Sequence, residues 1–222
     1  MTPTDVIAEV RKLIQDTATP YRYSDNSLLG YVNQTLKRMA LLRPDIFSYI
    51  GSISTTADTT VQSCPSDSVR LVEIFRVIGG NAVTEVSRET MDQSTPGWVS
   101  ASSVSPVKYI RHPRNPNRFF LYPAPTSGVT LEAEYVQSPP TYTVGQTITL
   151  LPDSYLPIVV DGAVFLSEAE DNEHVNNGRS RMFQEMFISE LAVGQKNRHI
   201  TDAENSGIDN RTYVADAGTV IT

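Results

Sequence analysis

Residues 20–47 read PYRYSDNSLLGYVNQTLKRMALLRPDIF, and this stretch predicts the helix around which the fold is organised. Ser24 or Asp25 can accept hydrogen bonds from the free backbone N–H groups at the start of a helix. Pro44 ends the helix, because proline disfavours helical backbone at the residue before it and brings no N–H. Apolar residues recur between them at spacings of three and four, namely Leu29, Val32, Leu36, Met39 and Ala40. We therefore predict an amphipathic helix over residues 24–43, whose apolar stripe needs a partner.

Three further helices are expected at the two ends of the chain. Residues 2–5, Thr-Pro-Thr-Asp, are typical of a helix start, with a capping threonine and a proline at the first helical position. Arg11 and Lys12 of this first helix are expected to face solvent. Two more helices are predicted, over residues 153–170 and from about 174 to 196. The core of the resulting four-helix bundle is predicted to contain Leu29, Val32, Leu36, Met39, Val160, Val164, Phe183, Met186 and Phe187.

The region between the helix pairs has a different composition, rich in Val, Ile, Thr and Tyr with frequent Pro, Gly and Ser. Gly79-Gly80-Asn81 is a typical hairpin turn. We expect an antiparallel β-sandwich or barrel here, so the fold class is α+β. Strands are predicted near residues 48–56, 60–63, 69–78, 82–87, 107–111, 118–123, 129–136 and 146–150. The expected domains are a helical unit (1–47 and 153–196), an inserted β domain (48–152) and an extended C-terminal arm (197–222).

Charge and composition exclude several classes of protein. The chain has 222 residues and a formal net charge of −7, which disfavours a protein that grips nucleic acid with its whole surface. Residues 153–196 are the most acidic part, with eight acidic and three basic residues. No stretch approaches the roughly 20 apolar residues of a membrane span, and the N-terminus lacks the pattern of a signal peptide. Cys64 is the one cysteine, so no internal disulfide can form.

The sequence contains no strong catalytic or metal-binding pattern. The acidic run of residues 168–173 lacks the spaced ligands and glycine of a calcium loop, and is more simply a solvated helix end. None of the three histidines has a second His or Cys at metal spacing. No Gly-rich phosphate loop follows a strand, and no serine lies in a Gly-x-Ser-x-Gly turn. We therefore expect no enzymatic activity, no cofactor and no metal site.

Basic and aromatic residues gather between residues 108 and 119. Such a mixture can bind single-stranded nucleic acid, but the interleaved prolines favour a rim or subunit-contact loop. Trp98, the only tryptophan, lies in a polar loop and either anchors a partner surface or packs locally. The expected contact rim is Trp98, Arg111, Arg114 and Arg118.

The opening stretch also resembles a known family. Three runs carry the resemblance: Pro20-Tyr21-Arg22-Tyr23-Ser24-Asp25, Leu28-Leu29-x-Tyr31-Val32-Asn33 and Met39-Ala40-Leu41-Leu42-Arg43-Pro44-Asp45. They are similar to the start of the head-to-tail adaptor proteins of tailed bacteriophages, and the similarity continues more loosely to a helix pair ending near Lys196. The resemblance implies a structural virion protein of the neck, made in the host cytoplasm.

Adaptors of this kind form a ring of about twelve copies under the portal of the filled head. The ring connects the portal to a tail or nozzle protein, and DNA leaves through its lumen without specific binding. The C-terminal extension reaches the portal, which implies a portal contact here through Tyr213, Val214, Val220 and Ile221. Two alternatives stay open. One is a minor tail or baseplate protein, and the other is a host-surface-binding β module, for which a single tryptophan is a poor platform.

Overall fold

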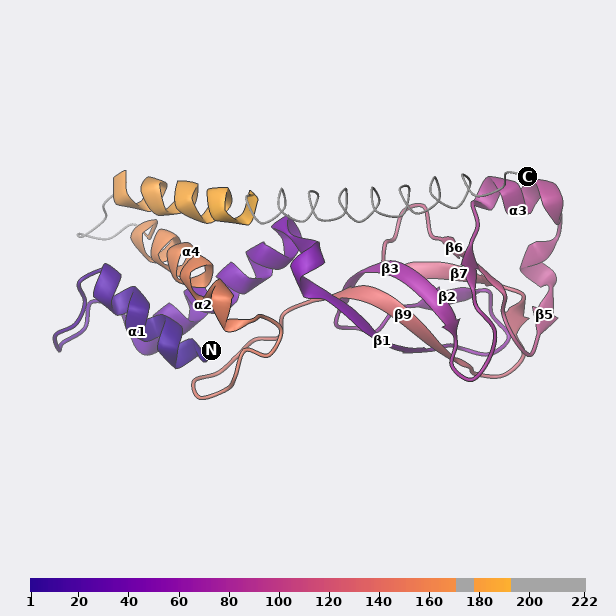
Figure 1. Cartoon of the computed structure of the whole chain (residues 1–222), viewed down its shortest axis with the longest axis horizontal. Coiled ribbons are helices and arrows are strands. Elements are labelled where there is room, and N and C mark those ends of the chain that lie inside the picture. Colours follow the sequence, from indigo (N-terminus) through magenta and orange to yellow (C-terminus); the bar gives the residue numbers. More distant parts are fainter. Residues whose placement is uncertain (171–177, 193–222) are drawn as a thin grey trace, which may run out of the picture. The chain divides into compact units, whose positions relative to one another are not determined.

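The computed structural model describes residues 1–170 and 178–192, which form two compact units (Figure 1). Unit 1 contains the chain up to Thr35 and again from Thr143 onward, and unit 2 contains Leu36–Tyr142. The first boundary therefore falls inside helix α2 (Asp25–Leu42). The division into domains at 47/48 and 152/153 stays a proposal.

Unit 1 is helical. Thr2 caps the first helix in a capping box with Asp5, and Ser24 caps the second through its hydroxyl, which accepts from the N–H of Ser27 at 3.1 Å. Both predicted helix starts are thus confirmed. The part of the expected fourth helix outside 178–192 lies outside the described residues. The elements are α1 (Pro3–Leu13), the first part of α2, the 3-10 helix η3 (Asp153–Tyr155), α4 (Leu156–Glu168) and a helical segment over residues 178–192.

A glycine sets the packing of α4. A Cβ added at Gly162 would lie 2.4 Å from Cγ2 of Thr35 and 3.0 Å from the ring of Phe187. The missing side chain therefore lets α4 approach both α2 and the segment 178–192 closely.

Most of the residues predicted for the helical core are buried, with two corrections. Leu28 is fully buried and Leu29 only partly, so the apolar stripe of α2 begins one position earlier than expected. Met186 is 40% exposed, because the buried line of its helix follows spacings of four and Met186 lies beside it. The other predicted core residues are all buried: Val32, Leu36, Met39, Val160, Val164, Phe183 and Phe187.

Unit 2 contains the strands. Its three-stranded antiparallel sheet has the order β1 (Ser48–Ser54), β9 (Thr130–Gln137) and β3 (Ser68–Val77). A second sheet has the order β2 (Val61–Ser63), β7 (Arg118–Tyr122), β6 (Lys108–Arg111) and β4 (Thr84–Glu85), and β5 (Ser102–Ser103) pairs with β8 (Ala124–Pro125). The short helices are η1 (Pro44–Phe47), α3 (Arg88–Ser94) and η2 (Trp98–Ser100).

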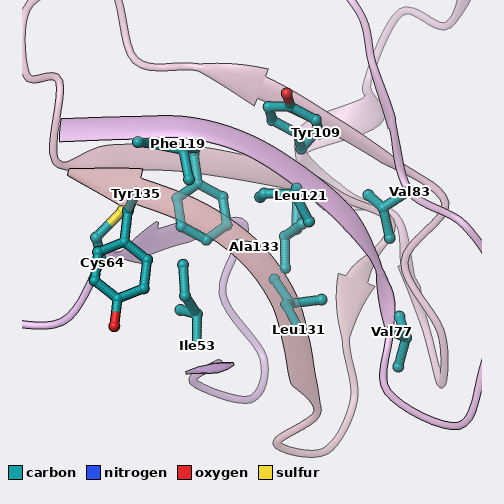
Figure 2. Close-up of a cluster of buried hydrophobic side chains, with 12 residues drawn as sticks. Ile53, Cys64, Val77, Val83, Tyr109, Phe119, Leu121, Leu131, Ala133 and Tyr135 are labelled. Carbon is teal, nitrogen blue, oxygen red and sulfur yellow. The ribbon is translucent and has the colours of Figure 1, made fainter. Parts of the chain in front are cut away.

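The first two sheets contribute side chains to one hydrophobic cluster (Figure 2). Leu131, Ala133 and Tyr135 of the central strand β9 are buried in it, because alternate residues of a strand face the same side. Phe119 and Leu121 of β7 fill the cluster from the other sheet. None of the sheets among the described residues closes on itself, so the expectation of a barrel is wrong, and a sandwich stays a proposal.

One strand expected in the β region is absent, and the turn expected there is present. Residues 146–150 form no strand, although Ile148 is buried and its N–H donates to the carbonyl of Met1 at 3.0 Å. The expected turn at residues 79–81 is present. The N–H of Val77 donates to the carbonyl of Asn81 at 2.9 Å, the N–H of Val83 donates to the carbonyl of Phe75 at 3.0 Å, and Arg76 and Ala82 form an antiparallel bridge. Strand β4 does not continue the pairing with β3 and instead pairs in parallel with β6. Since β6 lies farther along the chain, the local hairpin pattern does not indicate this partner.

Candidate functional site

A buried polar network in unit 1 surrounds Arg11. This side chain is 9% exposed, so the expectation that it faces solvent is wrong. Its guanidinium donates to Oδ2 of Asp16 at 2.6 Å, to the carbonyl of Tyr23 at 2.9 Å and to Oδ1 of Asp25 at 2.6 Å. The chain turns back after α1 with Gln15 at a φ of 58°, and this turn brings the three acceptors around the arginine.

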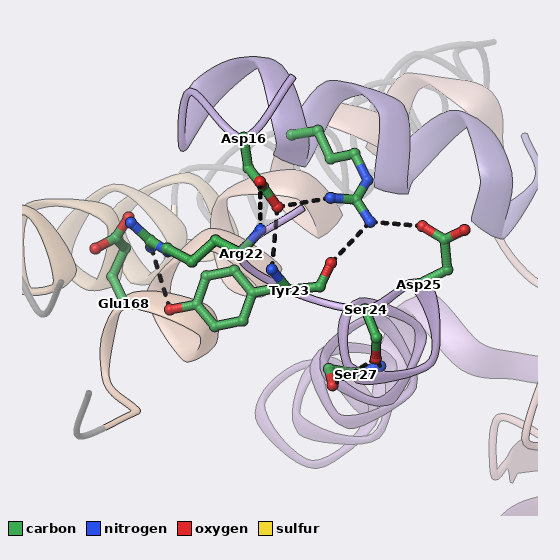
Figure 3. Close-up of polar contacts among 8 residues, drawn as sticks. Asp16, Arg22, Tyr23, Ser24, Asp25, Ser27 and Glu168 are labelled. Carbon is green, nitrogen blue, oxygen red and sulfur yellow. Dashed lines mark hydrogen bonds and ion pairs between the residues drawn. The ribbon is translucent and has the colours of Figure 1, made fainter. Parts of the chain in front are cut away.

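Asp16 connects this network to the aromatic loop. Its carboxylate accepts the backbone N–H of Arg22 at 2.7 Å and that of Tyr23 at 3.1 Å, in addition to the arginine (Figure 3). A buried carboxylate is tolerated when a cation and hydrogen-bond donors surround it in this way. The loop is therefore held by the end of α1.

The same loop is tied to the end of α4. The hydroxyl of Tyr23 donates to the carbonyl of Ser167 at 2.6 Å. The guanidinium of Arg22 lies 3.1 Å from Oε1 of Glu168, whose side chain is 2% exposed (Figure 3). Arg22 and Tyr23 of the PYRYSD run thus connect the end of α1 to the end of α4. Their role here is structural and not catalytic.

A second buried carboxyl in unit 1 belongs to Asp161 of α4, which is 7% exposed. Burial raises the pKa of Asp161 to about 6, and the neighbouring charge of Glu190 acts in the same direction. No hydrogen bond reaches this carboxyl from the described residues, so its ionised form is poorly compensated.

The basic residues predicted as a contact rim lie in unit 2 and differ from one another. Arg111 forms a two-pronged ion pair with Glu85, with distances of 2.7 Å and 3.0 Å, and this pair lowers the pKa of Glu85. The guanidinium also donates to the carbonyls of Leu71, at 3.1 Å, and Val72. Arg111 therefore fastens strand β6 to the edge of β3.

Of the two roles open for Trp98, burial favours local packing over a place in the contact rim. Trp98 is 4% exposed, packs with Met91 and Ile110, and donates from its indole nitrogen to Asp92 at 2.7 Å. The apolar ring is covered within unit 2, so Trp98 is not an exposed member of the expected rim.

The remaining rim residues, Arg114 and Arg118, are exposed, and unit 2 has a pocket of about 390 Å³ in this region. Arg118 lines this pocket and Arg114 does not. His112, also on the wall, stacks on Phe120 and accepts the N–H groups of Arg114 and Asn115 at its Nδ1. The lining residues are Arg70, Leu71, Val72, Arg111, His112, Pro116 and Arg118.

Sequence reasoning missed Arg70, because it lies in a strand about 40 residues away from the basic cluster and no local pattern connects the two.

The residues expected to contact the portal, Tyr213, Val214, Val220 and Ile221, lie outside the described residues. No group of three or more His, Cys, Asp or Glu residues that could hold a metal ion occurs within 1–170 and 178–192. None of the helices in that part of the chain combines the length and apolarity that crossing a membrane requires.

Comparison with protein families gives a match over residues 1–211, to the model for the SU10 adaptor protein. The chain belongs to the SU10 adaptor family. A comparison with curated proteins found no match. Membership of the SU10 adaptor family makes the chain a structural, adaptor-type bacteriophage protein and a component of the virion rather than an enzyme. It also implies association with other proteins of the phage head or tail.

Proposed function

We propose that copies of this chain assemble into a ring that docks on the portal, connects the capsid to a tail or nozzle protein and continues the DNA channel. The observation that carries this proposal is the family match, which spans residues 1–211 and therefore both compact units. A ring of about twelve copies would satisfy the symmetry expected of a closed homo-oligomer.

The packing of unit 1 suits a part that transmits load between head and tail. The Arg11–Asp16 ion pair fixes the aromatic loop, and the close approach at Gly162 leaves little room for the helices to slide. We assign the ring wall to this helical unit. Its surplus of acidic residues would repel phosphate groups and keep DNA from sticking to a channel that it lines.

The portal contact is assigned to residues 197–222, on two sequence features. The stretch is too polar to form its own core, and it carries two small apolar pairs, Tyr213-Val214 and Val220-Ile221. Such a segment gains order when a partner covers its apolar residues. A host-binding β module is disfavoured, because the indole of Trp98 is buried.

Electron microscopy of the purified protein, alone and mixed with its portal, tests the proposal. We expect rings with a central lumen, at least in the mixture, seated coaxially on the portal. Protein that never forms rings and does not bind portal would refute the proposal. Binding at the distal tail instead would favour a baseplate protein.

A further inference from the structure

The pocket beside β3 contains two arginines without a protein partner. Arg70 and Arg118 are exposed and line its wall, and neither side chain has a hydrogen bond or ion pair within the described residues. Their neighbour Arg111 differs, since Glu85 and two carbonyls occupy its donors. Two guanidinium groups beside one concave surface repel each other, so an anion bound there would be stabilised by both.

The pocket wall already shows how a carboxylate is bound. Arg111 lines the pocket, and Glu85, outside the lining, accepts from its Nε and Nη2 in a two-pronged arrangement. Arg70 and Arg118 offer the same fork to a second carboxylate. The volume of about 390 Å³ accommodates a few side chains and is far too small for a DNA duplex.

The distribution of charge identifies a source of carboxylates. Unit 2, which contains the pocket, has ten basic and nine acidic residues, a net charge of +1. The rest of the chain has eight basic and sixteen acidic residues, a net charge of −8. The net negative charge of unit 1 in one copy is therefore opposite to the charge of the arginines in the pocket of another, as in electrostatically matched interfaces.

We propose that this pocket binds acidic side chains of unit 1 of a second copy and so joins neighbouring subunits. This inference rests on the proposed assembly into a ring and names one of its contacts. Nucleic acid is the weaker candidate, because phosphate backbones are held by extended tracks of cations and unit 2 is almost neutral overall.

Charge reversal tests the contact. The double variant Arg70→Glu/Arg118→Glu is compared with Lys37→Glu, at an exposed lysine of unit 2 that does not line the pocket. Self-association is measured by analytical ultracentrifugation, alone and in the presence of portal, and folding by thermal unfolding. We expect the double variant to fold normally and to associate at least about tenfold more weakly, and the control to change less than about threefold.

Zero-length crosslinking tests the identity of the partner. In Arg70→Lys/Arg118→Lys protein, a carbodiimide joins each new amine only to a carboxylate in direct contact. A mixture of ¹⁴N- and ¹⁵N-labelled chains distinguishes contacts between copies from contacts within one copy. We expect mixed-label crosslinks from positions 70 and 118 to acidic residues of residues 1–35 or 143–222.

The outcomes separate this inference from the proposed function. Normal ring formation by the double variant, or crosslinks confined to single copies, overturns the pocket contact and leaves the ring intact. Failure of the wild-type chain to self-associate under either condition overturns both. Submicromolar binding of duplex DNA that is lost in the double variant would overturn the contact in favour of phosphate binding.

Discussion

Replacing Asp161 with Asn should stabilise the protein, and by an amount that depends on pH. The carboxyl lies in α4, 7% exposed, without a hydrogen bond from the described residues. Its pKa is raised from 3.8 to about 6, first by burial and then by the charge of Glu190. Asparagine has the shape of the protonated carboxyl and carries no charge, so it removes the cost of ionisation without opening a cavity.

The magnitude follows from the pKa. A raised pKa means that the folded state holds the proton more tightly than the unfolded state. The stability of the wild-type protein therefore decreases as pH rises from about 4 to about 6, and the whole penalty is present above this range. Two pKa units correspond to roughly 3 kcal/mol, and partial access of water reduces the expected penalty to about 1–3 kcal/mol.

Urea unfolding followed by circular dichroism between pH 4 and 8 measures the effect. Near pH 4 the two proteins should be about equally stable, and above pH 7 the Asn variant should be more stable by about 1–3 kcal/mol. Glu190→Gln should recover part of the gain, because it removes the second cause of the raised pKa. Glu185→Gln is the control, since this exposed carboxylate on the same helical segment should change stability by less than about 0.5 kcal/mol.

An Asn variant less stable than wild type above pH 7 would refute the reasoning, because it would mean that the ionised carboxyl has a compensating partner. A wild-type profile without a decrease between pH 4 and 6 would refute it equally.

Three further outcomes are expected. Arg11→Met leaves Asp16 buried without its cation and should destabilise the protein by about 3–5 kcal/mol in urea unfolding. Lys12→Met is the control, because this exposed side chain should change stability by less than about 0.5 kcal/mol. Equal effects of the two substitutions would contradict the burial of the ion pair. Gly162→Ala forces a methyl group against Thr35 and should cost about 1–3 kcal/mol, but Gly30→Ala, which meets nothing within 4 Å, should be neutral or stabilising by up to about 1 kcal/mol. Deletion of residues 205–222 should abolish portal binding in a co-sedimentation assay and leave the melting temperature nearly unchanged; undiminished binding would reassign the portal contact.

Local features of the chain could be predicted because their causes lie within a few residues. Thr2 and Ser24 begin helices by bonding to backbone groups three residues on, and Pro44 ends one through its own ring. The alternation in β9 likewise follows from strand geometry alone. The α+β composition and most of the longer helices and strands were therefore accessible from sequence, as was the adaptor resemblance of the 20–47 stretch.

The tertiary structure decided the features that depend on how the chain turns back and which segments meet in space. The helical pattern predicts that Arg11 faces solvent, and only the return of the chain places Asp16 and Asp25 around it. Strand β4 carries no sign that β6 is its neighbour, and the pocket gathers Arg70 and Arg118 from separate strands. A charged side chain can be buried only where opposite charges and hydrogen-bond partners surround it. These partners come from other segments of the chain, and local periodicity does not determine where those segments lie.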